Sequence, residues 1–198
     1  MHHVTHEDVR ADQRGGEQLM APSGAAPERS ASRQTRRQNA EQGFVASKVL
    51  IDNLQKVLVD LLELQLQGKQ AHWNVVGKNF RDTHKMLDEI IIDARTFSDT
   101  VAERVRALHG VPDGRSGTVA NTTTLPEFPH GEIDTTETID LVTERLEATI
   151  ITTRGVHDEV DAEDPTSADV LHQVIERLEQ FAWMVSAENR TPATRKKS

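Results

Sequence analysis

The sequence predicts an all-α protein, with four helices packed as a bundle between two flexible tails. Two observations support this. In four segments between residues 43 and 188, apolar residues recur at three- and four-residue steps, which places them on one face of a helix. No segment makes a convincing strand, so we expect no sheet.

The first two helices are expected on either side of a short turn. The first runs from about residue 44 to residue 72, and Asn74 and Gly77 then supply the turn. The second begins near residues 79–82 and ends before the stop signal at Gly110. These two helices therefore form a hairpin.

The connection over residues 110–133 is long for a helical domain, where about 2–8 residues are usual. A long crossover is one known way to connect a four-helix bundle. The third helix is expected to start at the capping pattern Asp134–Glu137. The fourth should start at Pro165, a residue suited to the first turn of a helix, and Trp183 is expected in its core face.

The charge is divided unevenly along the chain. The 198 residues carry 32 acidic and 23 basic side chains, a net charge of −9. Residues 1–42 are neutral, 43–188 carry −13 and 189–198 carry +4. Residues 1–40 also have almost no apolar periodicity and are rich in Gly, Pro, Ser, Gln and Arg, the composition of a segment that does not order itself. We therefore predict a flexible N-terminal tail over 1–42, a bundle over 43–188 and a basic C-terminal tail over 189–198. In the first tail, His2, His3 and His6 are either a further metal site or incidental.

The composition excludes several classes of protein. The chain has no cysteine, which removes disulfides, thiolate catalysis and cysteine zinc sites. No apolar run approaches the roughly 18–20 residues of a membrane helix, so no membrane partner is expected. The first residues lack the apolar core of a secretory signal, which favours the cytoplasm. The acidic total argues against a surface that binds nucleic acid all over.

A set of imidazoles and carboxylates lies on the first two predicted helices. His84 and Asp88 are four residues apart, as are Asp99 and Glu103, so each pair shares a helix face. The 11 residues from Asp88 to Asp99 are about three turns, which puts both pairs on nearly the same stripe. His72 ends the first helix, close to the start of the second. Such mixed nitrogen and oxygen ligands suit iron, zinc or manganese.

One chain cannot assemble all five ligands. His84 and Glu103 are 19 residues apart, roughly 28 Å along a helix, whereas metal–ligand bonds are about 2 Å. Either Asp99 and Glu103 meet a different metal, or an antiparallel partner brings its own pair against these histidines, as a two-fold dimer does. The plain alternative is a solvated acidic face with histidines that cap or pack.

The segment Lys69–Val75, KQAHWNV, resembles the signature of the Dps family, mini-ferritins that protect DNA in starved or oxidatively stressed cells. The resemblance covers about residues 43–188. Further matching segments are Asp82–His84, Leu87–Glu89, Asp99, Ala102–Arg104, Leu125–Pro129 and Phe181–Met184. It implies a ferritin-like four-helix bundle with a short helix in the long crossover, and twelve subunits in a hollow shell with 23 symmetry.

The resemblance also implies a ferroxidase centre at the two-fold interfaces of that homododecamer. By the match, His72, His84 and Asp88 come from one subunit, and Asp99 and Glu103 from its mate. The implied activity is oxidation of Fe(II), preferably with hydrogen peroxide rather than dioxygen, and storage of Fe(III) as a mineral. Zinc is a possible substitute in the di-iron site.

Two further features belong to the resemblance. Trp73, beside His72, is expected either to be oxidised in place of DNA or to pack at an interface. In the family, the start of the fourth helix lines acidic pores at the three-fold axes, so Asp164 and Asp169, with Asp161 next, are the expected pore residues. A negative funnel concentrates cations.

Neither tail is covered by the resemblance. An acidic shell repels DNA, so we expect any DNA binding to use the tails through phosphate contacts, strengthened by twelve copies, with the protein associated with the nucleoid. The candidate residues are Arg29, Arg33, Arg36, Arg37, Arg195, Lys196 and Lys197. The tails could instead serve solubility or assembly. Two alternative functions stay open: a nucleoid-binding structural protein with incidental metal, and a plain helical bundle.

Overall fold

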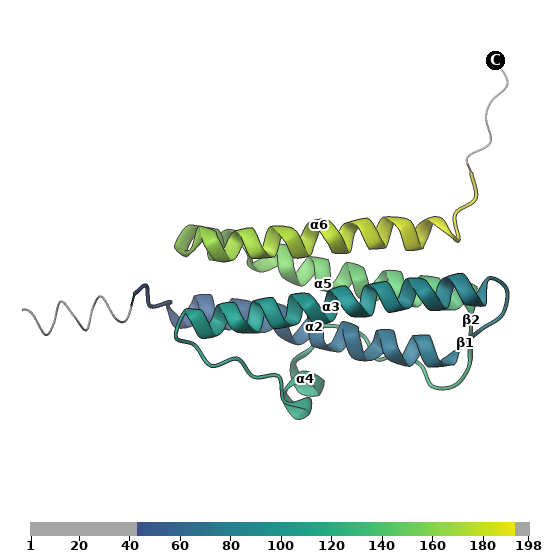
Figure 1. Ribbon diagram of the computed structural model, residues 1–198, viewed down its shortest axis with the longest axis horizontal. Coiled ribbons are helices and arrows are strands. Elements are labelled where there is room, and N and C mark those ends of the chain that lie inside the picture. The colour runs from purple at the N-terminus through teal and green to yellow at the C-terminus, as the bar shows by residue number, and fades with distance from the viewer. Residues whose placement is uncertain (1–42, 193–198) are drawn as a thin grey trace, which may run out of the picture. The chain divides into compact units, whose positions relative to one another are not determined.

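The computed structural model describes residues 43–192 as a bundle of four long helices with a long crossover (Figure 1). Two hairpins, α2–α3 and α5–α6, pack together chiefly through α2 and α5, and the short α4 lies in the crossover. The helices are α2 (Lys48–Asn74), α3 (Phe80–Ala107), α4 (Ser116–Thr122), α5 (Thr135–Glu163) and α6 (Pro165–Ala187). The predicted bundle and the short crossover helix are both confirmed. Within the described residues, no helix is long and apolar enough to cross a membrane.

The helix ends follow from local chemistry. The Asp134 carboxylate accepts hydrogen bonds from the backbone of Thr136 and Glu137, so the predicted cap of α5 is confirmed. Pro165 occupies the first turn of α6, also as expected. The first helix starts later than residue 44, because the hydroxyl of Ser47 caps it by accepting from the Leu50 N–H at 3.1 Å.

The expectation of no strand is wrong in one place. β1 (Val75–Val76) and β2 (Ile133–Asp134) pair in parallel, with Val75 opposite Ile133. Two residues are too few to show an alternating pattern, and their partners lie far apart in the sequence. This pairing joins the end of α2 to the end of the crossover, so α3 and α5 begin at the same end of the bundle (Figure 1).

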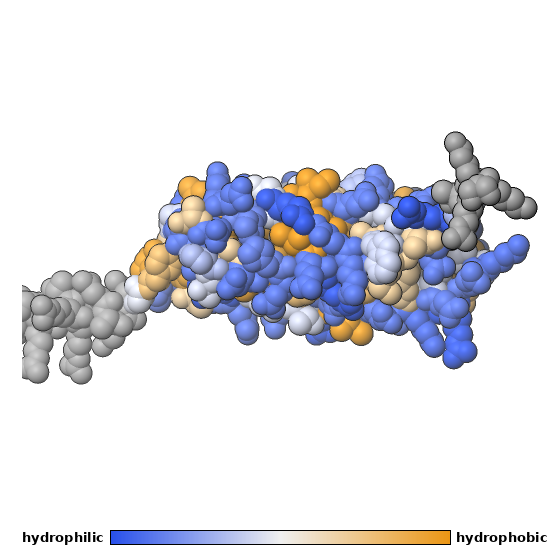
Figure 2. All heavy atoms as spheres, turned by 90° about the horizontal axis from the view of Figure 1, so that it is seen from above, coloured by the Kyte–Doolittle hydropathy of each residue, from blue (hydrophilic) through white to orange (hydrophobic). Residues whose placement is uncertain are grey.

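The bundle core is aliphatic and receives residues from all four long helices. Phe181 and Val185 of α6 are fully buried, whereas Trp183 is 64% exposed, so its predicted core position is wrong. Trp183 is two positions from each of these buried residues, which is about 200° around the helix, so its side chain points to the opposite side. Viewed from the α6 side, the surface is mostly hydrophilic with separate hydrophobic patches (Figure 2).

Two buried polar side chains hold the crossover against the bundle. The Asp60 carboxylate accepts from the Thr123 hydroxyl at 2.9 Å and from the backbone N–H of Thr124 at 2.8 Å. Arg145, 3% exposed, donates to the carbonyl of Glu127 at 2.8 Å. Buried polar groups need such partners, so these bonds determine the path of the crossover.

The predicted tail sites lie outside the described residues. They are His2, His3, His6, Arg29, Arg33, Arg36, Arg37, Arg195, Lys196 and Lys197.

Candidate metal centre

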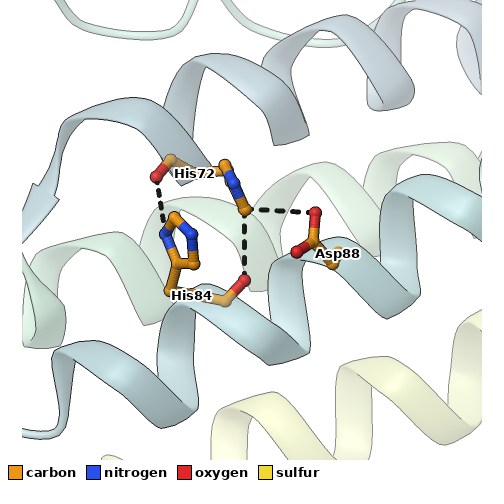
Figure 3. Close-up of side chains that lie close together, drawn as sticks. All are labelled: His72, His84 and Asp88. Atoms are coloured by element: carbon orange, nitrogen blue, oxygen red, sulfur yellow. Dashed lines mark hydrogen bonds and ion pairs between the residues drawn. The ribbon is translucent and has the colours of Figure 1, made fainter.

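His72 and His84 face each other where the first hairpin turns (Figure 3). His72 lies in the last turn of α2, and His84 lies near the start of α3. Gly77 and Asn79 adopt φ angles of +113° and +60° in the connection, a region that favours glycine and asparagine. This tight reversal stacks the two rings, whose centroids are 3.5 Å apart.

The two histidines are oriented by reciprocal hydrogen bonds. His72 Nδ1 lies 3.2 Å from the carbonyl oxygen of His84, and His84 Nδ1 lies 3.0 Å from the carbonyl oxygen of His72. Because a carbonyl oxygen only accepts, each Nδ1 carries the hydrogen. Each Nε2 then keeps the lone pair that a metal ion requires.

Asp88, one helical turn after His84, adds an oxygen to this group. Its Oδ1 lies 3.3 Å from His72 Nδ1 and 2.9 Å from Lys69 Nζ. Within the part of the chain that the structure describes, His72, His84 and Asp88 alone form a group of three metal-ligating side chains whose donor atoms all lie within 4.8 Å of one another. The structure thus brings together three of the five residues predicted from the sequence.

The charge states of two of these ligands favour a metal ion. Burial lowers the pKa of His72, although the neighbouring Asp88 carboxylate acts in the opposite direction. The hydrogen bond from Lys69 lowers the pKa of Asp88. His72 is therefore held neutral and Asp88 ionised at neutral pH, the forms that bind metals.

Asp99 and Glu103 lie on the far half of α3 and do not join this group. Both are exposed, and Asp99 lines an open hollow of about 530 Å³ between α2 and α3. α3 runs without a break from His84 to Glu103, so the two sets of ligands are separated by roughly 28 Å along the helix. Any metal that uses both sets of ligands must lie between two chains.

Trp73 is 71% exposed, although His72 beside it is only 9% exposed. The indole therefore lies on the surface next to the metal-ligand candidates. That position is compatible with both roles expected for it.

The three predicted pore residues have different environments. Asp161 and Asp169 are exposed, whereas Asp164 is buried at the α5–α6 junction. Burial raises the pKa of Asp164, but the hydrogen bonds from Ser167 and Arg104, the latter at 2.6 Å, outweigh it and hold that pKa below its usual range. The charge of Asp164 is thus offset within the chain.

Sequence reasoning missed one histidine pair and one lysine. His157 of α5 and His172 of α6 contact each other, and they lie seven residues before Asp164 and eight after it. In an antiparallel hairpin such positions face each other, so their similar distance from the predicted break was a usable signal. For Lys69, the sequence contains no comparable signal apart from its position in the segment that resembles the Dps family.

Known proteins are similar to this chain in sequence over about 70% of its length. The ferritin family, described as a ferritin-like domain, matches residues 51–191. DNA protection during starvation protein 2 of Deinococcus radiodurans is 34% identical over 140 residues, which span 71% of this chain and 58% of the relative. DNA protection during starvation protein of Agrobacterium fabrum is 32% identical over 143 residues, which span 72% of this chain and 88% of the relative.

The match to solved structures agrees with these relatives. The crystal structure of Dps92 from Deinococcus radiodurans superposes with a TM-score of 0.69 at 34% identity, over 71% of this chain and 85% of that chain. The ferritin-like match, the named relatives and the superposition agree with the helical bundle and its crossover. This chain therefore belongs to the Dps family of ferritin-like proteins.

Proposed function

We propose that this protein is a ferroxidase that oxidises Fe²⁺ with hydrogen peroxide at a site shared by two copies of the chain. One copy provides His72, His84 and Asp88, and the other provides Asp99 and Glu103. The observation that carries the proposal is the placement of three oriented ligands at one end of α3 and two exposed carboxylates at its other end.

The face of α3 between these two sets is suited to an antiparallel copy. Five positions make up this stripe: His84, Asp88, Ile92, Asp99 and Glu103. At 100° per residue, they fall within about 100° of the helix circumference. Ile92, in the middle of the stripe, is 60% exposed. An exposed apolar centre with ligands at both ends is self-complementary under two-fold symmetry, so each dimer would hold two equal sites.

The carboxylate and imidazole ligands have different roles in binding iron. The carboxylates of Asp88 and Glu103 bind Fe²⁺ through hard oxygens, and the histidines complete a weaker position. Two Fe²⁺ ions each give one electron, so one peroxide and two protons become two waters with no hydroxyl radical released. We assign Trp73, which is exposed beside the site, the role of an electron donor when only one Fe²⁺ is present.

Mixing two inactive variants tests whether the site is shared. His72→Ala/His84→Ala loses the ligands of one side, and Asp99→Ala/Glu103→Ala loses those of the other. Each alone should abolish peroxide-dependent Fe²⁺ oxidation, followed by absorbance in stopped flow. Co-assembled in equal amounts, half of the dimers are mixed and one of their two sites is intact, so about a quarter of the activity returns. A mixture that stays inactive contradicts a shared site. His130→Ala, a change at an exposed loop histidine, is the control and should keep full activity.

We further propose that twelve copies form a shell that stores Fe³⁺ and protects DNA. The relatives named above as DNA protection during starvation proteins support this role. In such a shell, Asp161 and Asp169 would supply the negative field for iron uptake, because Arg104 offsets the charge of Asp164. Sedimentation as a dimer or monomer under native conditions contradicts the shell.

The two tails are the proposed DNA contacts, because the body of the chain carries −13. Binding of duplex DNA should weaken steeply with salt, as phosphate contacts require. A gel-shift series over increasing salt, with the full chain and with residues 43–188, measures this. Equal binding by both proteins rules out the tails.

A further inference from the structure

A second pair of histidines lies outside the centre described above, on the α5–α6 hairpin. His157 Nε2 and His172 Nε2 are 2.7 Å apart, and their ring centroids are 4.5 Å apart. The side chain of His157 is 22% exposed and that of His172 is 58% exposed. The pair is therefore open to solvent on one side and supported by the bundle on the other.

Each ring has a carboxylate at its other nitrogen. His157 Nδ1 lies 3.1 Å from an oxygen of Asp158, and His172 Nδ1 lies 3.7 Å from an oxygen of Asp169. The nearer contact keeps the hydrogen of His157 on Nδ1, the arrangement that orients most metal-binding histidines, whereas 3.7 Å at His172 is longer than a hydrogen bond. The lone pair of His157 Nε2 is then directed at His172 Nε2, which donates the hydrogen bond between the rings.

When a metal ion binds between the rings, His172 carries its hydrogen on Nδ1, on the side of Asp169, and both Nε2 lone pairs face the ion. Such an ion requires only a small opening of the pair. Two bonds of 2.0–2.1 Å at a tetrahedral angle set the nitrogens about 3.3 Å apart. Because most of the His172 side chain is exposed, its ring has room to move by those few tenths of an ångström.

We propose that His157 and His172 bind a borderline divalent transition-metal ion such as Zn²⁺, at a site separate from the ferroxidase centre. Two imidazoles select such ions over Ca²⁺ and Mg²⁺, which prefer oxygen ligands. Asp158 and Asp169 orient the rings, and water fills the remaining positions.

The two sites lie at different ends of the bundle. The β1–β2 pair lies at the end of the bundle where both α3 and α5 begin (Figure 1). From that end, His84 is four residues into α3 and His157 is 22 residues into α5. At 1.5 Å per residue, the sites are roughly 27 Å apart along the bundle. One metal ion cannot serve both, so their occupancies can be measured separately.

Zinc counting by equilibrium dialysis tests the proposal on the full chain. The background variant carries His2→Gln, His3→Gln, His6→Gln, His72→Ala and His84→Ala, which leaves four histidines of the nine. We expect one Zn²⁺ per chain to remain, and to be lost when His157→Ala and His172→Ala are added. Adding His130→Ala instead, a change at an exposed loop histidine, should leave it in place.

Single changes keep the test independent of folding. His172→Gln alters a mostly exposed side chain and should weaken Zn²⁺ binding at least about tenfold, and Asp169→Asn should weaken it less, as for partners that orient a ligand. Circular dichroism checks that each variant is folded. Absence of Zn²⁺ in the background variant, or binding unaffected by His172→Gln, overturns the proposal and leaves a hydrogen bond between two neutral rings as the explanation of the 2.7 Å contact.

Discussion

Lys69 is expected to oppose metal binding at the proposed ferroxidase centre, and Lys69→Met should therefore tighten it. The ammonium lies 2.9 Å from Asp88 Oδ1, the same oxygen that approaches His72. A divalent ion bound at Asp88 Oδ1 displaces this contact, and an ion bound at the other carboxylate oxygen stays close to the ammonium, so both are repelled by its charge. Methionine keeps a similar flexible stem without the charge.

The size of the effect follows from the exposure of the pair. The side chains of Lys69 and Asp88 are 36% and 43% exposed, so solvent screens the interaction, and the dielectric constant of water gives its lower limit. Coulomb's law then gives about 2 kcal/mol between one unit charge and a divalent ion 4 Å away, and salt reduces this. The exposed ion pair itself adds roughly 0–1 kcal/mol. The net gain of about 1–2 kcal/mol corresponds to a Kd lowered about 5- to 30-fold.

Isothermal titration with Zn²⁺ measures this gain. The relevant binding event is the part of the isotherm that disappears in His72→Ala/His84→Ala. Lys78→Met is the matched control, because it removes the same charge from an exposed position in the adjacent turn and should change Kd less than about twofold. An unchanged Kd in Lys69→Met refutes the electrostatic reasoning, and a raised Kd shows that Lys69 instead holds Asp88 in place for the metal.

Three further predictions concern the bundle and use urea unfolding of otherwise identical chains. Arg104→Met leaves the buried Asp164 without its cation and should cost about 2–4 kcal/mol at pH 7. Because the folded-state pKa of Asp164 is lowered, its stabilisation is complete above its ordinary pKa and is lost progressively as pH falls through the lowered folded-state value, so the difference between variant and wild type should shrink steadily below about pH 4; a constant difference contradicts this. Asp60→Ala should cost about 2–3 kcal/mol and speed hydrogen exchange at Thr124, and unchanged exchange there argues against the anchor. Thr138→Val removes a buried hydroxyl that has no partner among the described residues, so stability should stay equal or rise by about 1 kcal/mol, and a loss above 1 kcal/mol contradicts this.

The helices and their caps could be predicted because their signals are local. Apolar spacing identified the four long helices, and Asp134 and Pro165 marked two of their starts. The two strands could not be predicted, because a pairing of Val75 with Ile133 depends on how the crossover returns to the bundle. Trp183 was misplaced because its apolar neighbours dominated the pattern, although its own position faces outward.

For the proposed metal centre, the sequence by itself determined the candidate ligand types, their order and a separation along α3 too long for one ion bound within a single chain. These depend only on residue identity and on the rise of a helix. Only the tertiary structure decided which atoms meet: the stacked rings of His72 and His84, the lysine on Asp88, and the second pair formed by His157 and His172. Such contacts join residues on different helices, so they depend on how the turns and the crossover align those helices.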